Sequence, residues 1–104
     1  YLVTGSPGGS RIITTVLQII LNVLDHEMNV AEAVSAPRIH HQWLPDEVFA
    51  EKTYPDETLK GLVERGHAIA TRVPNTSANS ILITKDGFAG AADTRTRGAT
   101  AVGY

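Results

Sequence analysis

The chain has 104 residues, of which 42% are hydrophobic and 19% charged, and a formal net charge of −2 at pH 7. This length allows at most one domain of ordinary size, and the composition is typical of a globular protein rather than a disordered one. The weak negative charge excludes the basic footprint of a protein that binds nucleic acid or an anionic membrane, and the lack of cysteine excludes disulfides, thiolate metal sites and a cysteine nucleophile.

No segment of the chain has the length and apolarity of a membrane span. The most apolar stretch, residues 12–24, is shorter than the roughly 18 residues that a span needs, and polar side chains such as Thr14 and Asn22 interrupt it. No signal peptide is recognised either. Because the chain opens on Tyr1, inside an expected strand, we expect it to be a piece of a longer polypeptide.

The first elements are predicted to be a strand, a glycine-rich turn and a helix. Residues 1–4 are expected to form the strand, and residues 5–9 a turn in which the glycines are free to adopt positive φ. Ser10 is a candidate N-cap for a helix over residues 11–26. The apolar residues of this helix cover more than one face, so we expect it to be buried nearly all round, by partner segments that so small a chain does not supply.

The middle and the end of the chain are predicted to mix helices and strands. Asn29 and Glu32 have the spacing of a capping box for a short helix over residues 30–35, which Pro37 ends. The other expected elements are an extended segment over 38–45, a strand over 47–51, a helix over 54–65 with Gly66 as its stop, strands over 68–73, 80–84 and 88–92, a loop over 74–78 and a hairpin turn at 85–87. The sum is a mixed α/β or α+β fold with antiparallel pairing at the C-terminal end.

The glycine turn before the long helix is the main candidate site. Backbone N–H groups at a helix N-terminus can hold a phosphate, a carboxylate or the oxyanion of an acyl-transfer intermediate. A P-loop is excluded because Gly9-Ser10-Arg11 lacks its lysine, and a nucleophile elbow is excluded because no serine is centred between glycines. What remains is Gly8-Gly9, whose two N–H groups can converge on one oxygen. A plain structural turn is the alternative.

Other polar residues support weaker hypotheses. His40 and His41 are adjacent, and neighbouring side chains of a strand point to opposite sides, so a structural role is favoured over a shared metal or a catalytic base. Arg38, Asp93 and Arg95 are interpreted as a buried ion-pair set, with clamps for a substrate carboxylate as the alternative. Nothing in these residues supplies an activated nucleophile together with its base.

Several motifs occur together along the chain. They are the run from Gly5 to Thr15, Asn29-Val30-Ala31-Glu32-Ala33, Ala36-Pro37-Arg38, His40-His41-Gln42-Trp43-Leu44-Pro45, and the ending with Ala92-Asp93, Arg95 and Gly103-Tyr104. In combination they closely resemble the small subunit of the γ-glutamyltranspeptidase (glutathione hydrolase) family, in its bacterial form. The resemblance extends over essentially the whole chain.

The resemblance implies an α+β fold, the αββα sandwich of the N-terminal-nucleophile hydrolases, of which residues 1–104 would be a C-terminal portion of a single catalytic domain. It implies a precursor that cleaves itself into a large and a small subunit and exposes an N-terminal threonine. That threonine attacks the γ-glutamyl amide of glutathione, and the acyl group then passes to water or to an acceptor amine. The implied location is periplasmic or secreted, and no metal or other cofactor is implied.

The resemblance also assigns roles to individual residues. The backbone N–H groups of Gly8 and Gly9 match the family's oxyanion hole, and Gly9 would also lie beside the bound glutamyl group. Arg38 and Arg95 match arginines of the family pattern and are expected to serve maturation and structural integrity. The nucleophilic threonine, and the paired serines that hold the substrate carboxylate, would lie upstream of Tyr1. We therefore expect this portion to be inactive without the large subunit and the rest of the small subunit.

Three other readings stay open at this point. The first is an acylase of the same superfamily that acts on β-lactam side chains. The second is a ligand-binding module in which the glycine turn holds phosphate or sulfate without chemistry. The third is a purely structural packing layer, for which substitution of Gly8 or Gly9 would leave turnover unchanged.

Overall fold

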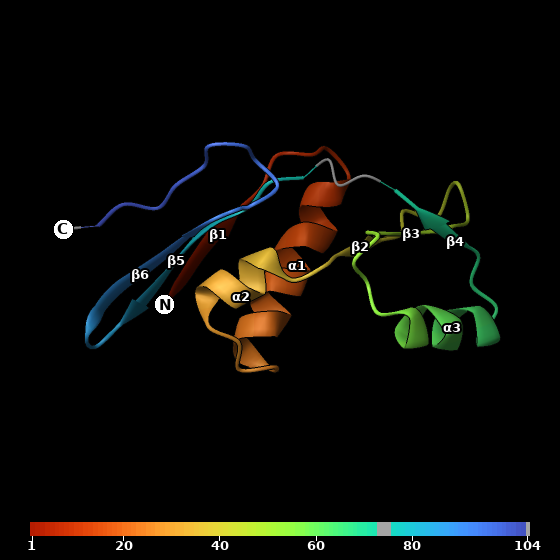
Figure 1. The fold of residues 1–104 in the computed structure, drawn as a ribbon, viewed down its shortest axis with the longest axis horizontal. Coiled ribbons are helices and arrows are strands. Elements are labelled where there is room, and N and C mark those ends of the chain that lie inside the picture. The colour runs from red at the N-terminus through yellow and green to blue at the C-terminus, as the bar shows by residue number, and fades with distance from the viewer. Residues whose placement is uncertain (73–75, 104) are drawn as a thin grey trace. The chain divides into compact units, whose positions relative to one another are not determined.

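The computed structural model describes residues 1–72 and 76–103. The chain divides into two compact units, of which one combines the residues up to Ala36 with those from Thr76 onward, and the other begins at Pro37 (Figure 1). Val73, Pro74 and Asn75 lie outside the described residues, as does Tyr104. The predicted end of the strand over 68–73, the start of the loop over 74–78 and the last residue of the family motif therefore lie outside them too.

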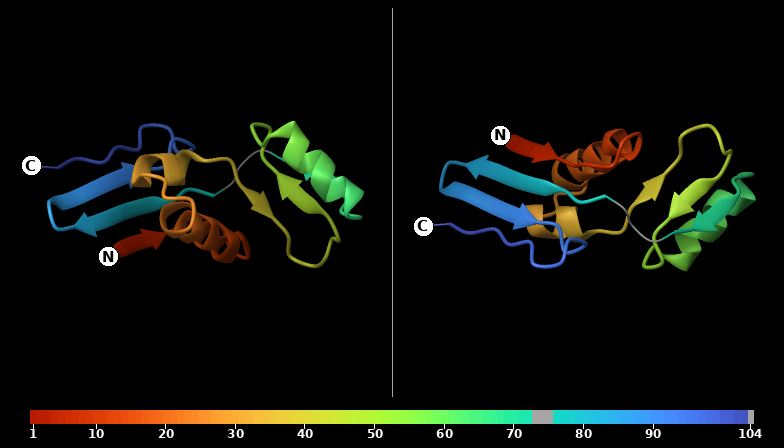
Figure 2. Two further views of the ribbon diagram at one scale, coloured as in Figure 1. Left: turned by 90° about the horizontal axis from the view of Figure 1, so that it is seen from below. Right: turned by 90° about the horizontal axis from the view of Figure 1, so that it is seen from above.

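A three-stranded antiparallel sheet forms one half of the first unit. Its strands are β1 (Leu2–Gly5), β5 (Asn79–Thr84) and β6 (Gly87–Ala92), in the order β1-β5-β6. The predicted hairpin is confirmed, since β5 and β6 pair from Asn79 opposite Ala92 to Thr84 opposite Gly87, and they run side by side in both views of Figure 2. The pairing of β1 with β5, far apart in sequence, was not predicted.

Two helices pack on one face of this sheet (Figure 1). Helix α1 (Arg11–Leu24) ends two residues before its predicted end, while α2 (Val30–Ser35) matches the prediction. The predicted capping box is confirmed, because the Asn29 side chain accepts from the Glu32 N–H and the Glu32 carboxylate accepts from the Asn29 N–H. Ser10 occupies the N-cap of α1 in a helical conformation and makes no side-chain cap hydrogen bond.

The core of the first unit is small and lies between the helices and the sheet. It consists of Ile19, Val30, Val34, Ala78 and Ala91, with Leu2 and Leu82 packed against it. All of these side chains are short or medium-sized, which allows α2 to pack close to β5 and β6.

Within this chain α1 is buried on one side only, and its burial on the other sides by partner segments stays a prediction. Only Thr15 and Ile19 of the helix are buried, whereas Ile13, Leu17 and Leu24 are 73%, 50% and 66% exposed. The reason is geometric, because the sheet and α2 cover one side of the helix and no other described segment of the unit covers the opposite side.

The sheet also leaves an apolar face uncovered. The register places Val3 opposite Ile81 on the side of the sheet away from the core, and these side chains are 59% and 45% exposed. Phe88, which pairs with Ile83 at the hairpin end, is 80% exposed. We call Val3, Ile81, Ile83 and Phe88 the outer sheet face.

The second unit is a smaller three-stranded sheet with one helix. Its strands are β2 (Ile39–His40), β3 (Val48–Ala50) and β4 (Ile69–Thr71), and α3 (Asp56–Glu64) connects β3 to β4. Strand β3 pairs antiparallel with β2 and parallel with β4. Gly66 has a φ of 94°, so the predicted glycine stop after α3 is confirmed.

No helix among the described residues is both long and apolar enough to cross a membrane.

Candidate functional site

The glycine turn lies between the end of β1 and the start of α1. Gly8 and Gly9 have φ angles of 132° and 59°, in the region that residues with a side chain rarely adopt. A Cβ added to Gly9 would meet no atom within 4 Å. Glycine is therefore required at this position by the backbone conformation and not by crowding from within this chain.

The carbonyl groups of the turn are used by the helix, while its N–H groups are not. The Arg11 N–H donates to the Gly8 carbonyl and the Ile12 N–H to the Gly9 carbonyl, each at 3.1 Å, which closes the first turn of α1. Within the described part of the chain, the N–H groups of Gly8 and Gly9 donate to no other residue. Two consecutive backbone donors at a helix N-terminus are thus available to an anion.

The serine of the turn has no feature of a nucleophile. The Ser6 hydroxyl donates to the Pro7 carbonyl at 2.7 Å, a local contact that orders the turn. This agrees with the sequence analysis, which found donors at this site but no attacking group.

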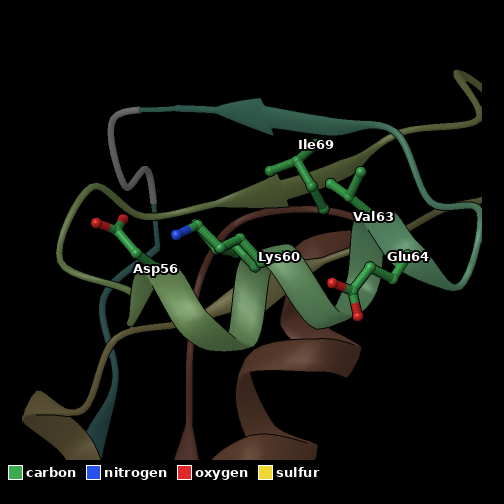
Figure 3. Close-up of a pocket in the computed structure, with 6 residues that line it drawn as sticks. Asp56, Lys60, Val63, Glu64 and Ile69 are labelled. Carbon is green, nitrogen blue, oxygen red and sulfur yellow. The ribbon is translucent and has the colours of Figure 1, made fainter.

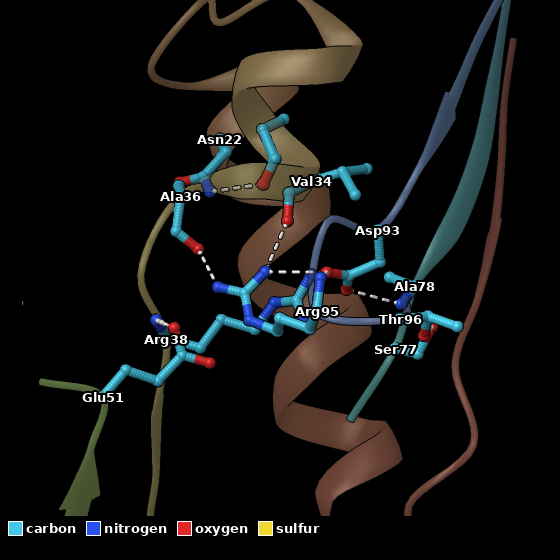
Figure 4. A network of polar contacts seen from close by, with 11 residues as sticks. Asn22, Val34, Ala36, Arg38, Glu51, Ser77, Ala78, Asp93, Arg95 and Thr96 are labelled. Atoms are coloured by element: carbon cyan, nitrogen blue, oxygen red, sulfur yellow. Dashed lines mark hydrogen bonds and ion pairs between the residues drawn. The ribbon is translucent and has the colours of Figure 1, made fainter. Parts of the chain in front are cut away.

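Arg95 and Asp93 form a buried ion pair in the same unit (Figure 4). The Arg95 Nη1 lies 3.0 Å from Asp93 Oδ1, with side chains that are 10% and 0% exposed. Arg95 also donates to the carbonyl groups of Val34 and Ala36, at 3.0 and 2.7 Å. The guanidinium group therefore binds the C-terminal end of α2, where unpaired carbonyl groups carry partial negative charge.

The other oxygen of the Asp93 carboxylate holds the start of β5. Asp93 Oδ2 accepts from the Ala78 N–H at 2.7 Å, and Oδ1 accepts in addition from the Arg95 N–H at 2.9 Å. One buried carboxylate thus joins the segment after β6, the segment before β5 and, through Arg95, helix α2. The sequence predicted the ion pair but carried no signal for the contact with the Ala78 backbone.

Arg38 lies in the second unit and is 6% exposed. Its N–H donates to the Glu51 carboxylate at 3.2 Å, and its carbonyl accepts from the Glu51 N–H at 3.1 Å. Arg38 thereby extends the pairing of β2 with β3 by one residue. Of the predicted site residues, Gly8 and Gly9 form the turn and Arg95 lies in the ion pair, all in the first unit, whereas Arg38 belongs to the second unit.

The adjacent histidines have different partners. His40 is 7% exposed, stacks on Phe49 and lies 3.0 Å from the Gln42 side-chain oxygen. His41 lies 3.1 Å from an Asp46 carboxylate oxygen and accepts from the Trp43 N–H. Each ring is thus engaged in contacts within the second unit, in agreement with the favoured structural interpretation.

The second unit contains a pocket of about 390 Å³ (Figure 3). It lies between α3 and β4 and is lined by Asp56, Leu59, Lys60, Val63, Glu64 and Ile69. Its floor is aliphatic and its charged side chains come from the exposed side of α3. It holds no group of polar atoms directed at one point, so it offers less chemistry than the glycine turn.

Comparison with known proteins connects the chain to a family. The model of the gamma-glutamyltranspeptidase family matches residues 1–103. The chain is 51% identical to the glutathione hydrolase proenzyme of Escherichia coli over 105 residues, which is 100% of this chain and 18% of that protein. The chain thus spans about a fifth of the length of this relative.

Solved structures give the same result for the fold. A gamma-glutamyltranspeptidase from Helicobacter pylori has a TM-score of 0.85 at 50% identity, over 92% of this chain and 54% of that one. A cephalosporin acylase from Bacillus halodurans has a TM-score of 0.81 at 27% identity, over 89% of this chain and 18% of that one. The predicted fold class is confirmed: the chain is α+β and forms a portion of the αββα sandwich of the N-terminal-nucleophile hydrolases.

Proposed function

The chain belongs to the gamma-glutamyltranspeptidase family, and on this premise we propose that it is part of an enzyme that transfers γ-glutamyl groups. The donor is glutathione or another γ-glutamyl amide, and the acceptor is water, an amino acid or a peptide. The observation that carries this proposal is the Gly8-Gly9 turn, with two available N–H donors, in a chain that resembles a glutathione hydrolase along its whole length.

The role proposed for the turn follows from the charge that acyl transfer creates. When a nucleophile adds to the γ-carbonyl carbon of the donor, the carbonyl oxygen becomes an oxyanion. The N–H groups of Gly8 and Gly9 bind this oxygen, at the positive end of α1. Gly9 in addition lies beside the glutamyl group, where a side chain would approach the substrate.

The rest of the chemistry is assigned to residues outside this chain. A threonine hydroxyl adds to the γ-carbonyl carbon, its proton passes by way of the threonine α-amino group to the departing amine, and the amide C–N bond breaks. Water or an acceptor amine then attacks the resulting ester, which releases glutamate or a new γ-glutamyl compound. Paired serines of the missing segment hold the substrate carboxylate.

Two exposed apolar surfaces support the proposal that other segments of the same precursor complete the enzyme. One is the side of α1 that carries Ile13, Leu17 and Leu24, and the other is the outer sheet face. Apolar faces on both a helix and a sheet of one unit indicate further layers on either side. We assign these layers to the large subunit and the remaining small-subunit segment, within a single catalytic domain that includes residues 1–104.

Arg38 and Arg95 are proposed to act in maturation and structural integrity rather than on substrate. The contacts of Arg95 with Val34, Ala36 and Asp93, together with that of Asp93 with the Ala78 N–H, hold three segments together. Such a network supports the precursor while it cleaves itself. The proposed location is periplasmic or secreted, and the reaction as proposed uses no metal or other cofactor.

The test is turnover of a γ-glutamyl anilide by the full-length protein that carries this chain. Gly8→Ala forces a side chain onto a backbone with φ of 132° and displaces the donors, so we expect kcat to fall about 100-fold, the effect of losing one oxyanion donor. Gly5→Ala is the matched control, because Gly5 precedes the turn and a Cβ there meets no atom within 4 Å. Equal activity of both variants would contradict the oxyanion role.

The cephalosporin acylase likeness supports a second candidate, an acylase for β-lactam side chains. The same turn would serve it, since amide cleavage creates the same oxyanion. Release of the side-chain acid from a cephalosporin, without release of aniline from the γ-glutamyl anilide, would favour the acylase. A full-length protein that cleaves neither substrate and is stabilised by phosphate would favour the non-catalytic binding module.

A further inference from the structure

Thr4 is the last residue of β1 with a side chain before the glycine turn, and its hydroxyl contacts the central strand. Thr4 Oγ1 lies 2.8 Å from the Oγ of Ser80. The two residues are directly opposite in the pairing of β1 with β5. Ser80 is 2% exposed and Thr4 is partly buried, so the Thr4 hydroxyl supplies the hydrogen-bond partner that the buried Ser80 hydroxyl needs.

Strand β5, which pairs with the strand of Thr4, is fixed at its N-terminal end by a buried hydrogen bond. The Ala78 N–H, two residues before Ser80, donates to the Asp93 carboxylate at 2.7 Å. Asp93 is 0% exposed and is paired with Arg95 (Figure 4). The backbone next to Ser80 is therefore positioned by a buried ion pair.

The end of β1 pairs with β5 through the backbone as far as Gly5 opposite Asn79, but few side-chain contacts set its position. Within the described part of the chain, β1 pairs with β5 alone and is an edge strand. Gly5 follows Thr4 and brings no side chain, and a Cβ at Gly5 would meet nothing within 4 Å. The hydroxyl contact of Thr4 is thus the last side-chain anchor before the backbone turns toward Gly8 and Gly9.

From these contacts we propose that Thr4 and Ser80 are positioning residues for acyl transfer. Their hydrogen bond holds the end of β1 in the place that directs the Gly8 and Gly9 N–H groups at the oxyanion. The inference rests on the proposed function, and neither hydroxyl touches the substrate. A small displacement of oxyanion donors weakens binding of the transition state more than binding of the substrate.

The test compares single and double variants of the full-length enzyme with a γ-glutamyl anilide. For Thr4→Val and for Ser80→Ala we expect kcat to fall about tenfold, because the donors are displaced, while KM stays within about twofold. Thr4→Ser keeps the hydroxyl and should restore turnover. Thr4→Val also lowers Tm, because it leaves the Ser80 hydroxyl buried and unpaired. Ser80→Ala lowers Tm less, because the Thr4 hydroxyl that it leaves unpaired is only partly buried.

The double variant separates positioning from stability. Thr4→Val with Ser80→Ala removes both hydroxyls, so no buried hydroxyl is left unpaired and Tm should return toward that of the wild type. The directional contact is still absent, and kcat should therefore stay low. Thr84→Val is the matched control, since its hydroxyl donates to Gly87 at the opposite, exposed end of β5, and it should leave kcat unchanged.

Three results would overturn the inference. In the first, kcat recovers together with Tm in the double variant. In the second, Thr84→Val lowers kcat as much as Thr4→Val does. In the third, the wild-type enzyme cleaves the anilide and neither single variant changes kcat, which removes the positioning role but leaves the proposed function intact. A wild-type enzyme that does not cleave the anilide contradicts the proposed function itself.

Discussion

At the scale of single residues, the chain shows how one buried charge can organise three segments. The Asp93 carboxylate accepts from the Ala78 and Arg95 N–H groups and from the Arg95 guanidinium group. These partners are all donors, and they compensate the negative charge of a side chain that is 0% exposed. Such a charge stabilises the fold only while its whole set of partners is present.

Asp93→Asn should therefore destabilise the protein strongly. The substitution leaves the Arg95 charge buried without its counter-ion and replaces one acceptor oxygen with a donor, so we expect a loss of about 3 kcal/mol in the free energy of unfolding. Urea denaturation measures this change in the free energy of unfolding. Asp86→Asn in the exposed hairpin turn is the control, and an equally small effect of both substitutions would show that the buried pair is not stabilising.

At the scale of elements, short helices depend on their ends. Helix α2 has only six residues, too few to be stable from intrinsic propensity. The capping box at its start and Arg95 at its end satisfy backbone groups that the helix itself leaves unpaired. Its stability thus comes from both termini and from the burial of Val30, Ala33 and Val34.

Asn29→Ala tests the N-terminal half of this arrangement. It removes the acceptor for the Glu32 N–H, which lies 2.9 Å from Asn29 Oδ1, and should cost about 1 kcal/mol in unfolding free energy. Asn29→Asp retains an acceptor at the same place and should restore most of the stability. If Asn29→Ala were neutral in urea denaturation, the capping box would have no energetic role.

At the scale of the whole molecule, the chain carries apolar surfaces that none of its own described segments covers. The exposed side chains on α1 and on the outer sheet face belong to one unit and lie on different elements of it. Burying them against other segments of the precursor would contribute roughly 25 cal/mol for each Å² removed from water. We therefore expect assembly with those segments to be driven by apolar contact.

Leu17→Glu tests this expectation, because Leu17 is 50% exposed on the apolar side of α1. A charge buried at the interface should weaken assembly with the remaining segments at least about tenfold. Size-exclusion chromatography of the co-expressed segments gives the measurement. Thr58→Glu, at an exposed position of α3, is the helical control, and equal loss of complex for both variants would contradict an interface on α1.

The sequence by itself determined the features that depend on local chemistry. The capping box of α2, the glycine stop at Gly66 and the hairpin between β5 and β6 each follow from neighbouring residues, since their hydrogen bonds close within a few positions. The glycine turn was recognised in the same way, from its place between a strand and a helix. Its oxyanion role is a prediction that the turnover of Gly8→Ala will test.

Only the tertiary structure decided which distant residues meet. Thr4 pairs with Ser80, β3 with β4, and the Asp93 carboxylate with the Ala78 N–H, and each pairing joins positions that are distant in the sequence. No local pattern encodes these partners, because a hydroxyl or a backbone N–H carries no mark of the residue it will meet. The same holds for α1: periodicity shows which of its faces are apolar, whereas their burial depends on the segments that the fold brings against them.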